Sequence, residues 1–239
     1  MRIVRRGYLP EYETFFKGKE LEKLKNASFD AIFLLNRGYK VKVATMFVQQ
    51  HYQLAEPQRL SIARSIASDE SIELRQKKVL QKEDCKEKEV YIDGFNAIIP
   101  MESLVSDSPL FLCMDGAIRD MANLKGSYSV IDKTEKAIHL ILQQLDKLEV
   151  RKANIFFDKP VSNSGRLKSL IAEIAEKYNY KVELNIELLN AVDKELYGKE
   201  NVISGDCIIL DECVSWIPFY KWIVEDYQKE HSVWLVQVY

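Results

Sequence analysis

The chain of 239 residues lacks any apolar run of the roughly 18 to 20 residues that a membrane-spanning helix needs. Residues 1–6 contain three arginines, and no apolar core of a secretion signal follows them. The chain has only three histidines, and its four cysteines form no Cys-x-x-Cys pair, so the paired ligands of a structural zinc site are missing. We therefore expect a cytoplasmic protein that keeps its cysteines reduced and does not bind a membrane.

Motifs of several large enzyme classes are also missing. The sequence contains no Gly-x-Ser-x-Gly, no Gly-x-Gly-x-x-Gly and no Gly-Lys-Ser/Thr. These absences argue against a serine hydrolase, a dinucleotide-binding enzyme and a P-loop NTPase. The apolar fraction of 47% is nevertheless sufficient for a hydrophobic core.

Charge is distributed unevenly along the chain. Residues 1–68 carry 12 Lys or Arg against 6 Asp or Glu, a net +6, whereas residues 69–239 carry 22 against 30, a net −8. A basic part beside an acidic part suits a nucleic-acid enzyme, because basic side chains bind phosphates and carboxylates bind metal ions. The simpler interpretation is that the basic residues solvate a helical surface, and charge alone favours it.

The apolar pattern indicates a helical part followed by an α/β part. Helices are predicted at 19–35, at about 40–54 and from Pro57 through Ile66. The next segment has 13 charged residues among 21, which predicts a solvated helix or a linker. The predicted division is a helical domain over 1–68, a charged linker over 69–89 and an α/β domain over 90–239.

From residue 90 onward, short apolar runs alternate with helical patterns. Strands are predicted at 90–92, 110–114, 154–157, 181–186, 201–204 and 232–238. Helices are predicted at 134–148, 166–178 and 218–228. This alternation predicts a mainly parallel sheet flanked by helices, so the expected class is α/β with a small all-α N-terminal domain.

Aspartates follow several of these strands. Asp93, Asp158 and Asp206 each follow one, and Asp193 lies in a short turn or helix before the last. Ligands of an α/β sheet gather beyond the carboxyl ends of its strands, so these acids should meet. At about 4 Å and an effective dielectric near 20, each like-charged pair costs about 4 kcal/mol, so the cluster needs a cation such as Mg²⁺ or Mn²⁺. One such aspartate alone would more often cap a helix or form a turn, but the repetition favours a shared acidic site.

These positions resemble a known group of nuclease domains. The segment 92–96, Ile-Asp-Gly-Phe-Asn, is similar to the Asp-Gly-x-Asn opening of PIN-like and NYN-type nucleases, and 156–158 is similar to their second strand. Asp193 and Asp206 resemble their late pair of acids. The whole chain resembles an uncharacterised prokaryotic family that joins a helical domain of unknown function to a PIN-like domain. The segments that carry this wider likeness are 35–39, 52–59, 115–120 and 158–167.

The resemblance implies a metal-dependent ribonuclease, with DNA as the less favoured substrate. In that chemistry a water activated by Mg²⁺ or Mn²⁺ attacks phosphorus. The catalytic residues implied by the resemblance are Asp93, Asn96, Asp158, Asp193 and Asp206, of which the four aspartates would ligate the metal directly or through water. The family's second acid lies on a helix after the first strand, and its candidates here are Asp115, Asp120 and Glu135.

A second set of residues is a candidate for binding phosphate or RNA. Loop 159–166 lies between a strand end and a helix start, where free amides suit a phosphate and Arg166 can bind one bidentately. Ordinary helix capping by Asn163 or Ser164 explains the loop equally well. The candidate contacts are Ser162, Asn163, Ser164, Arg166, Arg119, Arg37 and Arg59.

Two other functions remain open. A catalytically inactive PIN-like protein would bind RNA or act as a scaffold without cutting. A phosphoesterase acting on a small substrate would use the same acids together with loop 159–166. The oligomeric state has no signature in the sequence.

Overall fold

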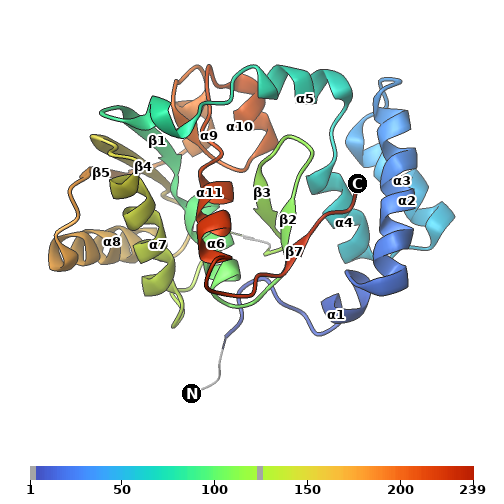
Figure 1. The fold of residues 1–239 in the computed structure, drawn as a ribbon, viewed down its shortest axis with the longest axis horizontal. Coiled ribbons are helices and arrows are strands. Elements are labelled where there is room, and N and C mark those ends of the chain that lie inside the picture. Colours follow the sequence, from blue (N-terminus) through green and yellow to red (C-terminus); the bar gives the residue numbers. More distant parts are fainter. Residues whose placement is uncertain (1–3, 123–125) are drawn as a thin grey trace.

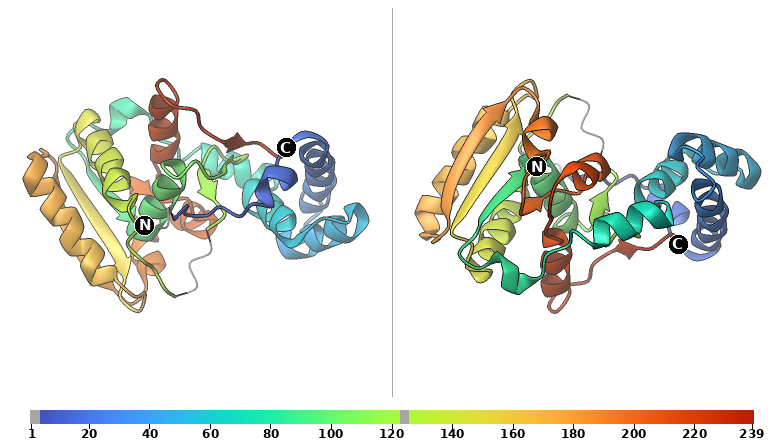
Figure 2. Two further views of the ribbon diagram at one scale, coloured as in Figure 1. Left: turned by 90° about the horizontal axis from the view of Figure 1, so that it is seen from below. Right: turned by 90° about the horizontal axis from the view of Figure 1, so that it is seen from above.

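The computed structural model describes residues 4–122 and 126–239 (Figure 1). A helical part and a parallel sheet flanked by helices lie at opposite ends of the molecule, with a smaller sheet between them (Figure 2). The expected α/β class, with a parallel sheet and an N-terminal helical region, is therefore confirmed. No helix in either described range is both long and apolar enough to cross a membrane.

The N-terminal part consists of α1 (Tyr12–Phe15), α2 (Gly18–Leu35), α3 (Val41–Tyr52) and α4 (Glu56–Ser65). The three longer helices were predicted from the apolar pattern, and the structure confirms them. α2 buries Leu24, Ala27 and Ala31, which share one face because they recur every three to four residues. α4 begins where the Gln58 side chain accepts a hydrogen bond from the Ala55 amide at 2.9 Å.

The charged segment that follows contains the helix α5 (Asp69–Gln76) and the 3-10 turn η1 (Lys82–Cys85). Ser68 caps α5 by accepting a hydrogen bond from the Ser71 amide at 3.3 Å. The segment was expected to be a solvated helix or a linker, and α5 is a helix in which Arg75 is the buried residue. The Arg75 carbonyl accepts a hydrogen bond from the Trp216 ring at 2.9 Å. The segment therefore packs onto the α/β part.

Four parallel strands form the larger sheet, in the order β5 (Glu183–Leu189), β4 (Lys152–Asp158), β1 (Glu89–Asp93) and β6 (Val202–Ile203). Ile92 of β1 lies beside Ile155 of β4 and Ile203 of β6. Because side chains alternate between faces, β4 directs Phe156 to one apolar core and Phe157 to another. All four strands were predicted from their apolar runs.

Helices cover both faces of this sheet. The face of Phe157 carries α6 (Gly94–Leu104), α7 (Thr134–Lys147), α8 (Ser164–Tyr178) and α11 (Phe219–Tyr227). The face of Phe156 carries α9 (Val192–Leu196), α10 (Cys207–Glu212) and the ring of Trp216. The sequence did not predict α6 or α10. Residues on every side of α6 are buried, so its apolar residues form no stripe of helical period.

A second sheet connects the two ends of the molecule. Its order is β3 (Ile118–Asp120), β2 (Leu110–Leu112) and β7 (Leu235–Val236), with β2 antiparallel to β3 and parallel to β7. β2 and β7 coincide with predicted strands, whereas β3 has only three residues and was missed. Phe111 of β2 meets Phe16 edge to face, with ring centroids 5.1 Å apart. The apolar core of the helical part therefore includes residues from beyond residue 90.

Candidate active site

The candidate acids lie at the carboxyl edge of the parallel sheet. Asp93 is the last residue of β1, Asp158 is the last residue of β4, and Asp206 caps α10 shortly after β6. Because β4, β1 and β6 are parallel neighbours, their ends meet at one edge. Asp193 joins this edge from the first turn of α9, which contacts β1 and β4. We refer to these four residues as the edge aspartates.

The Asp-Gly-x-Asn segment forms a tight entry into α6. Asp93 is 4% exposed and accepts hydrogen bonds from the Asn96 amide, at 3.2 Å, and from the Asn96 side chain. A Cβ at Gly94 would lie 2.3 Å from Cε1 of Phe157, so a larger residue cannot fit. Asn96 therefore holds Asp93 in place, and the motif caps a helix as well as supplying an acid.

Two of the edge aspartates, Asp93 and Asp193, have raised pKa values. Burial raises the pKa of Asp93 to about 7; the Asn96 hydrogen bonds oppose this shift, and the charges of Asp193 and Asp158 add to it. Burial also raises the pKa of Asp193, and Asp206 and Asp158 raise it further. None of the four carboxylates forms an ion pair within residues 4–122 and 126–239. Their negative charge is thus not neutralised by the described part of the chain.

The oxygen atoms at this edge suit a hard cation. Asp158 Oδ1 accepts a hydrogen bond from the Val192 amide at 3.3 Å, and Asp206 Oδ1 accepts one from the Ile208 amide at 2.8 Å. Among the described residues, the second oxygen of these two carboxylates accepts no hydrogen bond and is left for a ligand. Carboxylate oxygens are what Mg²⁺ and Mn²⁺ prefer. The described ranges contain no group of three Asp, Glu, His or Cys side chains already arranged to hold a metal ion. The donor set therefore fits the ion in chemistry, and rotated side chains or bridging waters would have to complete its coordination.

A cleft of about 390 Å³ opens between the parallel sheet and the helical part, and Asp206 is the edge aspartate that lines it. Asn96 and Asp206 line it on the sheet side, and Arg64 of α4 lines it on the helical side. Asp120 also lines the cleft. Burial raises the pKa of Asp120 to about 6, although the charge of Arg64 opposes this shift. This volume lies within the range of about 300 to 1,000 Å³ that is typical of ligand-binding clefts.

The three candidates for a further acid lie in different environments. Asp120 lines the cleft. Asp115 is 2% exposed and is held in an ion network behind the cleft wall. Glu135 lies on α7, with its Oε1 4.0 Å from Nζ of Lys177, and lines a separate hollow. Of the three, Asp120 is therefore the one placed to contribute to the site.

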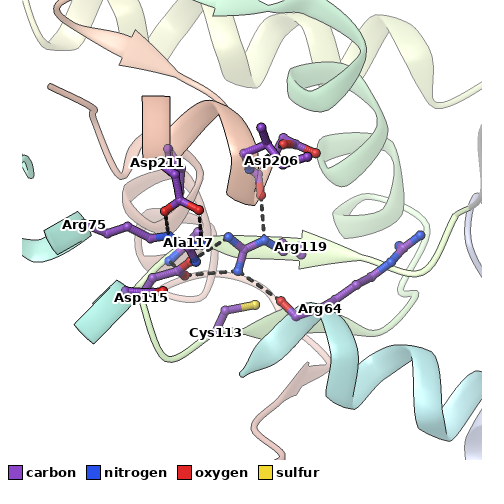
Figure 3. A network of polar contacts seen from close by, with 12 residues as sticks. Arg64, Arg75, Cys113, Asp115, Ala117, Arg119, Asp206 and Asp211 are labelled. Atoms are coloured by element: carbon purple, nitrogen blue, oxygen red, sulfur yellow. Dashed lines mark hydrogen bonds and ion pairs between the residues drawn. The ribbon is translucent and has the colours of Figure 1, made fainter. Parts of the chain in front are cut away.

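A buried ion network holds the cleft wall together (Figure 3). Asp115 Oδ2 accepts hydrogen bonds from Nη1 of Arg75 at 2.8 Å and Nη2 of Arg119 at 2.7 Å. Arg75 also binds both carboxylate oxygens of Asp211, at 2.7 and 2.9 Å. Burial alone would raise the pKa of Asp115, but Arg119, the Ala117 amide and Arg75 together lower it. The network joins α5, β3 and α10.

Arg119, a candidate for nucleic-acid binding, is committed to protein contacts. Its Nε donates to the Gly205 carbonyl at 2.6 Å, and its Nη1 donates to the Arg64 carbonyl at 3.1 Å. With its bonds to Asp115, four of its five N–H groups are occupied. Arg119 therefore fixes the loop that leads into Asp206 and acts as a positioning residue.

The loop 159–166 is anchored by its own side chains. Ser162 Oγ accepts a hydrogen bond from the Tyr128 amide at 3.1 Å, and Asn163 Nδ2 donates to the Tyr128 carbonyl at 2.6 Å. Ser164 is buried at the start of α8, and Arg166 lines the same hollow as Glu135. Three acids, Asp132, Glu135 and Glu173, line that hollow, so it does not favour a phosphate. The contacts observed are those of loop anchoring and helix entry.

The two remaining basic candidates lie on the surface of the helical part. The Arg37 guanidinium stacks 3.9 Å from the ring centroid of Phe33. Arg59 binds Glu56, with Nε and Oε2 3.0 Å apart. Neither residue lines the cleft.

Arg64, which lines the cleft, and Glu102, which is buried in α6, were not identified as candidates from the sequence. Arg64 lines the cleft from α4. It belongs to no recognisable sequence motif. Glu102 of α6 is fully buried and accepts hydrogen bonds from Arg6 at 2.7 Å and from the Tyr128 hydroxyl at 2.6 Å. An isolated glutamate in an otherwise apolar helix is the one sign that could have drawn attention to Glu102.

The fold and the site define a two-part α/β protein with an acidic edge beside a cleft. A family model described as a domain of unknown function (DUF5616) matches residues 82–222, and the chain belongs to this family. A model described as a protein of unknown function (DUF434) matches residues 23–78. The chain is 37% identical over 187 residues to "Uncharacterized protein MJ0935" of Methanocaldococcus jannaschii, which covers 78% of this chain and 88% of the relative. No solved structure is significantly similar to the chain.

Proposed function

We propose that this protein is a metal-dependent ribonuclease with a PIN-like α/β part. The observation that carries the proposal is the group of edge aspartates: four carboxylates meet at one sheet edge, and none of them forms an ion pair in the described ranges. Unneutralised carboxylates at one sheet edge destabilise a fold, so their presence together favours a bound cation. The implied ion is Mg²⁺ or Mn²⁺.

In this proposal the edge aspartates hold the ion, directly or through water. When bound, the ion would neutralise charge on the phosphate and make a water molecule more acidic. Asn96 orients Asp93, and Arg119 holds the loop of Asp206, so both residues keep ligands in place. Arg64 lines the same cleft as Asp206; its Nη1 donates to the Asp120 carbonyl, and its other N–H groups are suited to bind a substrate phosphate.

RNA is favoured over a small phosphate ester by the position of the cleft. It lies between the acidic edge and the helical part, which carries the net positive charge of residues 1–68. A strand of RNA can contact both sides, whereas a small ester would need only the acidic side. Loop 159–166, which would have supported the phosphoesterase, is anchored to Tyr128 instead.

A catalytically inactive RNA-binding protein is the second candidate. It is favoured by one observation: the described residues contain no ready-made group of three metal-binding side chains. In this case Arg64 and the helical part would hold RNA, and the edge aspartates would bind no catalytic ion.

Cleavage assays distinguish these functions. Purified protein and an Asp93→Asn, Asp206→Asn double variant would be incubated with labelled single-stranded and structured RNAs in Mg²⁺, Mn²⁺ or EDTA. Asparagine caps a helix as well as aspartate does, so the double variant should fold. Asp107→Asn is a matched control, because Asp107 is exposed and its φ of 53° is a conformation that asparagine adopts readily.

We expect metal-dependent cleavage by the wild type and by Asp107→Asn, and a loss of at least about a hundredfold in the double variant. RNA that binds with salt dependence but is never cut would support the inactive protein. Cleavage that survives in the double variant would show that the site has been placed wrongly.

A further inference from the structure

A second pocket adjoins the cleft at the turn between α2 and α3. It has a volume of about 480 Å³, and Tyr39 and Lys40 of this turn line it. Ala63 of α4 and Cys207 of α10 line both this pocket and the cleft. These two side chains are small and partly exposed, so the boundary between the two spaces is low. We call the second space the turn pocket.

The turn that lines this pocket is fixed against α5. The Asn36 side chain donates a hydrogen bond to Asp69 Oδ2 at 2.8 Å, and its Oδ1 accepts one from the Asp69 amide at 2.8 Å. Gly38 has a φ of 84°, the left-handed conformation that this tight turn requires. α5 also contacts α10 (Figure 1). The same helix therefore supports the turn pocket and one wall of the cleft.

The charges at the turn pocket favour a chain of phosphates. Arg75 and Asp211 line the pocket and neutralise each other through hydrogen bonds of 2.7 and 2.9 Å. Of the described acids that line it, Glu70 remains. The turn itself contains no acid over residues 36–43 and three basic residues, Arg37, Lys40 and Lys42. The basic residues outnumber Glu70, so this end of the groove attracts a polyanion.

Tyr39 provides an aromatic face for a nucleic-acid base. Its side chain is 52% exposed, and among the described side chains no aromatic ring stacks on it. Aromatic rings bind the bases of single strands by stacking, whereas the bases of a duplex are already paired and stacked. Cations beside an aromatic ring, here Lys40 and, in the adjoining cleft, Arg64, are typical of a groove that binds one strand.

We propose that the cleft and the turn pocket together bind one unpaired strand of RNA, with a base on Tyr39 and phosphates on Lys40 and Arg64. The strand crosses Ala63 and Cys207 on its way from the cleft to the turn. The helical part thereby selects single-stranded over duplex RNA, because stacking on Tyr39 needs a base without a pairing partner. This inference rests on the proposed function for the identity of the substrate.

Binding can be measured apart from cleavage in the Asp93→Asn, Asp206→Asn variant. The probes are a labelled oligouridylate of about 12 nucleotides and a labelled duplex of the same length, and fluorescence anisotropy in EDTA gives both dissociation constants. We expect the single strand to bind more tightly than the duplex. Adding Tyr39→Ala should raise the dissociation constant of the single strand about 5- to 150-fold, because one stacked base is lost. Tyr39→Phe keeps the ring and should keep the affinity.

The matched control is Tyr178→Ala. Tyr178 is 48% exposed at the end of α8 and lines neither the cleft nor the turn pocket, so this variant should bind as before. Both tyrosines are exposed, so the variants should keep the circular dichroism spectrum of the double variant.

Charge substitutions test the path of the strand. Lys40→Met should weaken binding and reduce the slope of log affinity against log salt by about 0.7, the value for one phosphate contact of a single strand. Glu70→Gln should tighten binding, because it removes the acid that faces the phosphates. An unchanged salt slope in Lys40→Met, or weaker binding in Glu70→Gln, would overturn this path.

The proposed groove and the proposed function fail separately. An unchanged affinity in Tyr39→Ala, an equal loss in Tyr39→Phe, tighter binding of the duplex or no binding of RNA would overturn the groove. RNA that binds through Tyr39 but is never cut by the wild type would overturn the ribonuclease and support the groove. Cleavage by the wild type together with an unaffected Tyr39→Ala variant would do the reverse.

Discussion

Asp115 and the edge aspartates are the same kind of residue in opposite electrostatic surroundings. Asp115 is buried between two arginines, which together with the Ala117 amide lower its pKa. Asp93 is buried to a similar degree; burial raises its pKa to about 7, and the charges of Asp193 and Asp158 add to this shift. Because burial raises the pKa at both positions, the comparison shows that the arginine partners of Asp115 account for the opposite directions of the two shifts.

The ion network and the acidic edge are also mechanically connected. Arg119 binds Asp115 on one side and the Gly205 carbonyl on the other, and Gly205 directly precedes Asp206. The neutralised network therefore supports the loop that carries one of the unneutralised acids. Removing a charge from the ion network should lower the stability of the fold, whereas removing a charge from the acidic edge should raise it.

The largest effect should follow the loss of Arg119. Arg119→Met leaves Asp115 with Arg75 as its arginine partner and removes the donor to the Gly205 carbonyl, so we expect a loss of about 3 to 5 kcal/mol in the free energy of unfolding. Urea denaturation would measure it. Arg37→Met is the control, because that guanidinium is exposed and should change stability by less than about 0.5 kcal/mol. A loss below 1 kcal/mol for Arg119→Met would mean that the network does not stabilise the fold.

Removing the charge of Asp93 should increase the free energy of unfolding, whereas removing the charge of Arg119 should decrease it. Its pKa is about 7 in the folded chain, above the value of about 3.9 for an unfolded chain, so the protonated form favours folding. That contribution is complete below about pH 4 and is lost as the pH rises through 7. At about 1.4 kcal/mol for each pKa unit, the loss approaches about 4 kcal/mol.

Asp93→Asn should therefore be more stable than the wild type at pH 8 in EDTA and equal to it near pH 4. Denaturation of both proteins between pH 4 and 8 would measure the difference, which should grow with pH. Asp107→Asn should follow the wild-type curve. A constant difference across this range would contradict the raised pKa of Asp93.

A smaller effect should come from metal binding. Mg²⁺ or Mn²⁺ at a hundredfold excess over its dissociation constant should stabilise the wild type by about 2.7 kcal/mol. An Asp193→Asn, Asp206→Asn variant should lose this gain, because it removes two of the edge carboxylates, while Asp107→Asn should keep it. Thermal unfolding with and without metal would measure both. Equal stabilisation of all three proteins would place the ion elsewhere.

The sequence anticipated those parts of the fold whose signal is local. α2, α3 and α4 follow apolar stripes, and the strands of the parallel sheet follow short apolar runs. It missed α6, because burial on all sides erases the helical period. It missed β3 because Ile118 is followed directly by the charged residues Arg119 and Asp120, so this strand forms no apolar run.

Other candidate residues turned out to have structural contacts. Ser162 and Asn163 anchor their loop to the backbone of Tyr128, which is more than 30 residues away. Arg119 has its N–H groups committed to Gly205, Arg64 and Asp115. A residue's type and its local spacing do not reveal such partners, so phosphate binding and structural anchoring looked alike in the sequence.

What the sequence by itself determined is the position of the acids. A strand-ending aspartate is a local feature, and parallel strands place their ends at one edge in every such sheet. What only the tertiary structure decided is which acids are neutralised. The partners of Arg75 come from 40 residues away at Asp115 and 136 residues away at Asp211, and the chain must fold before those charges meet.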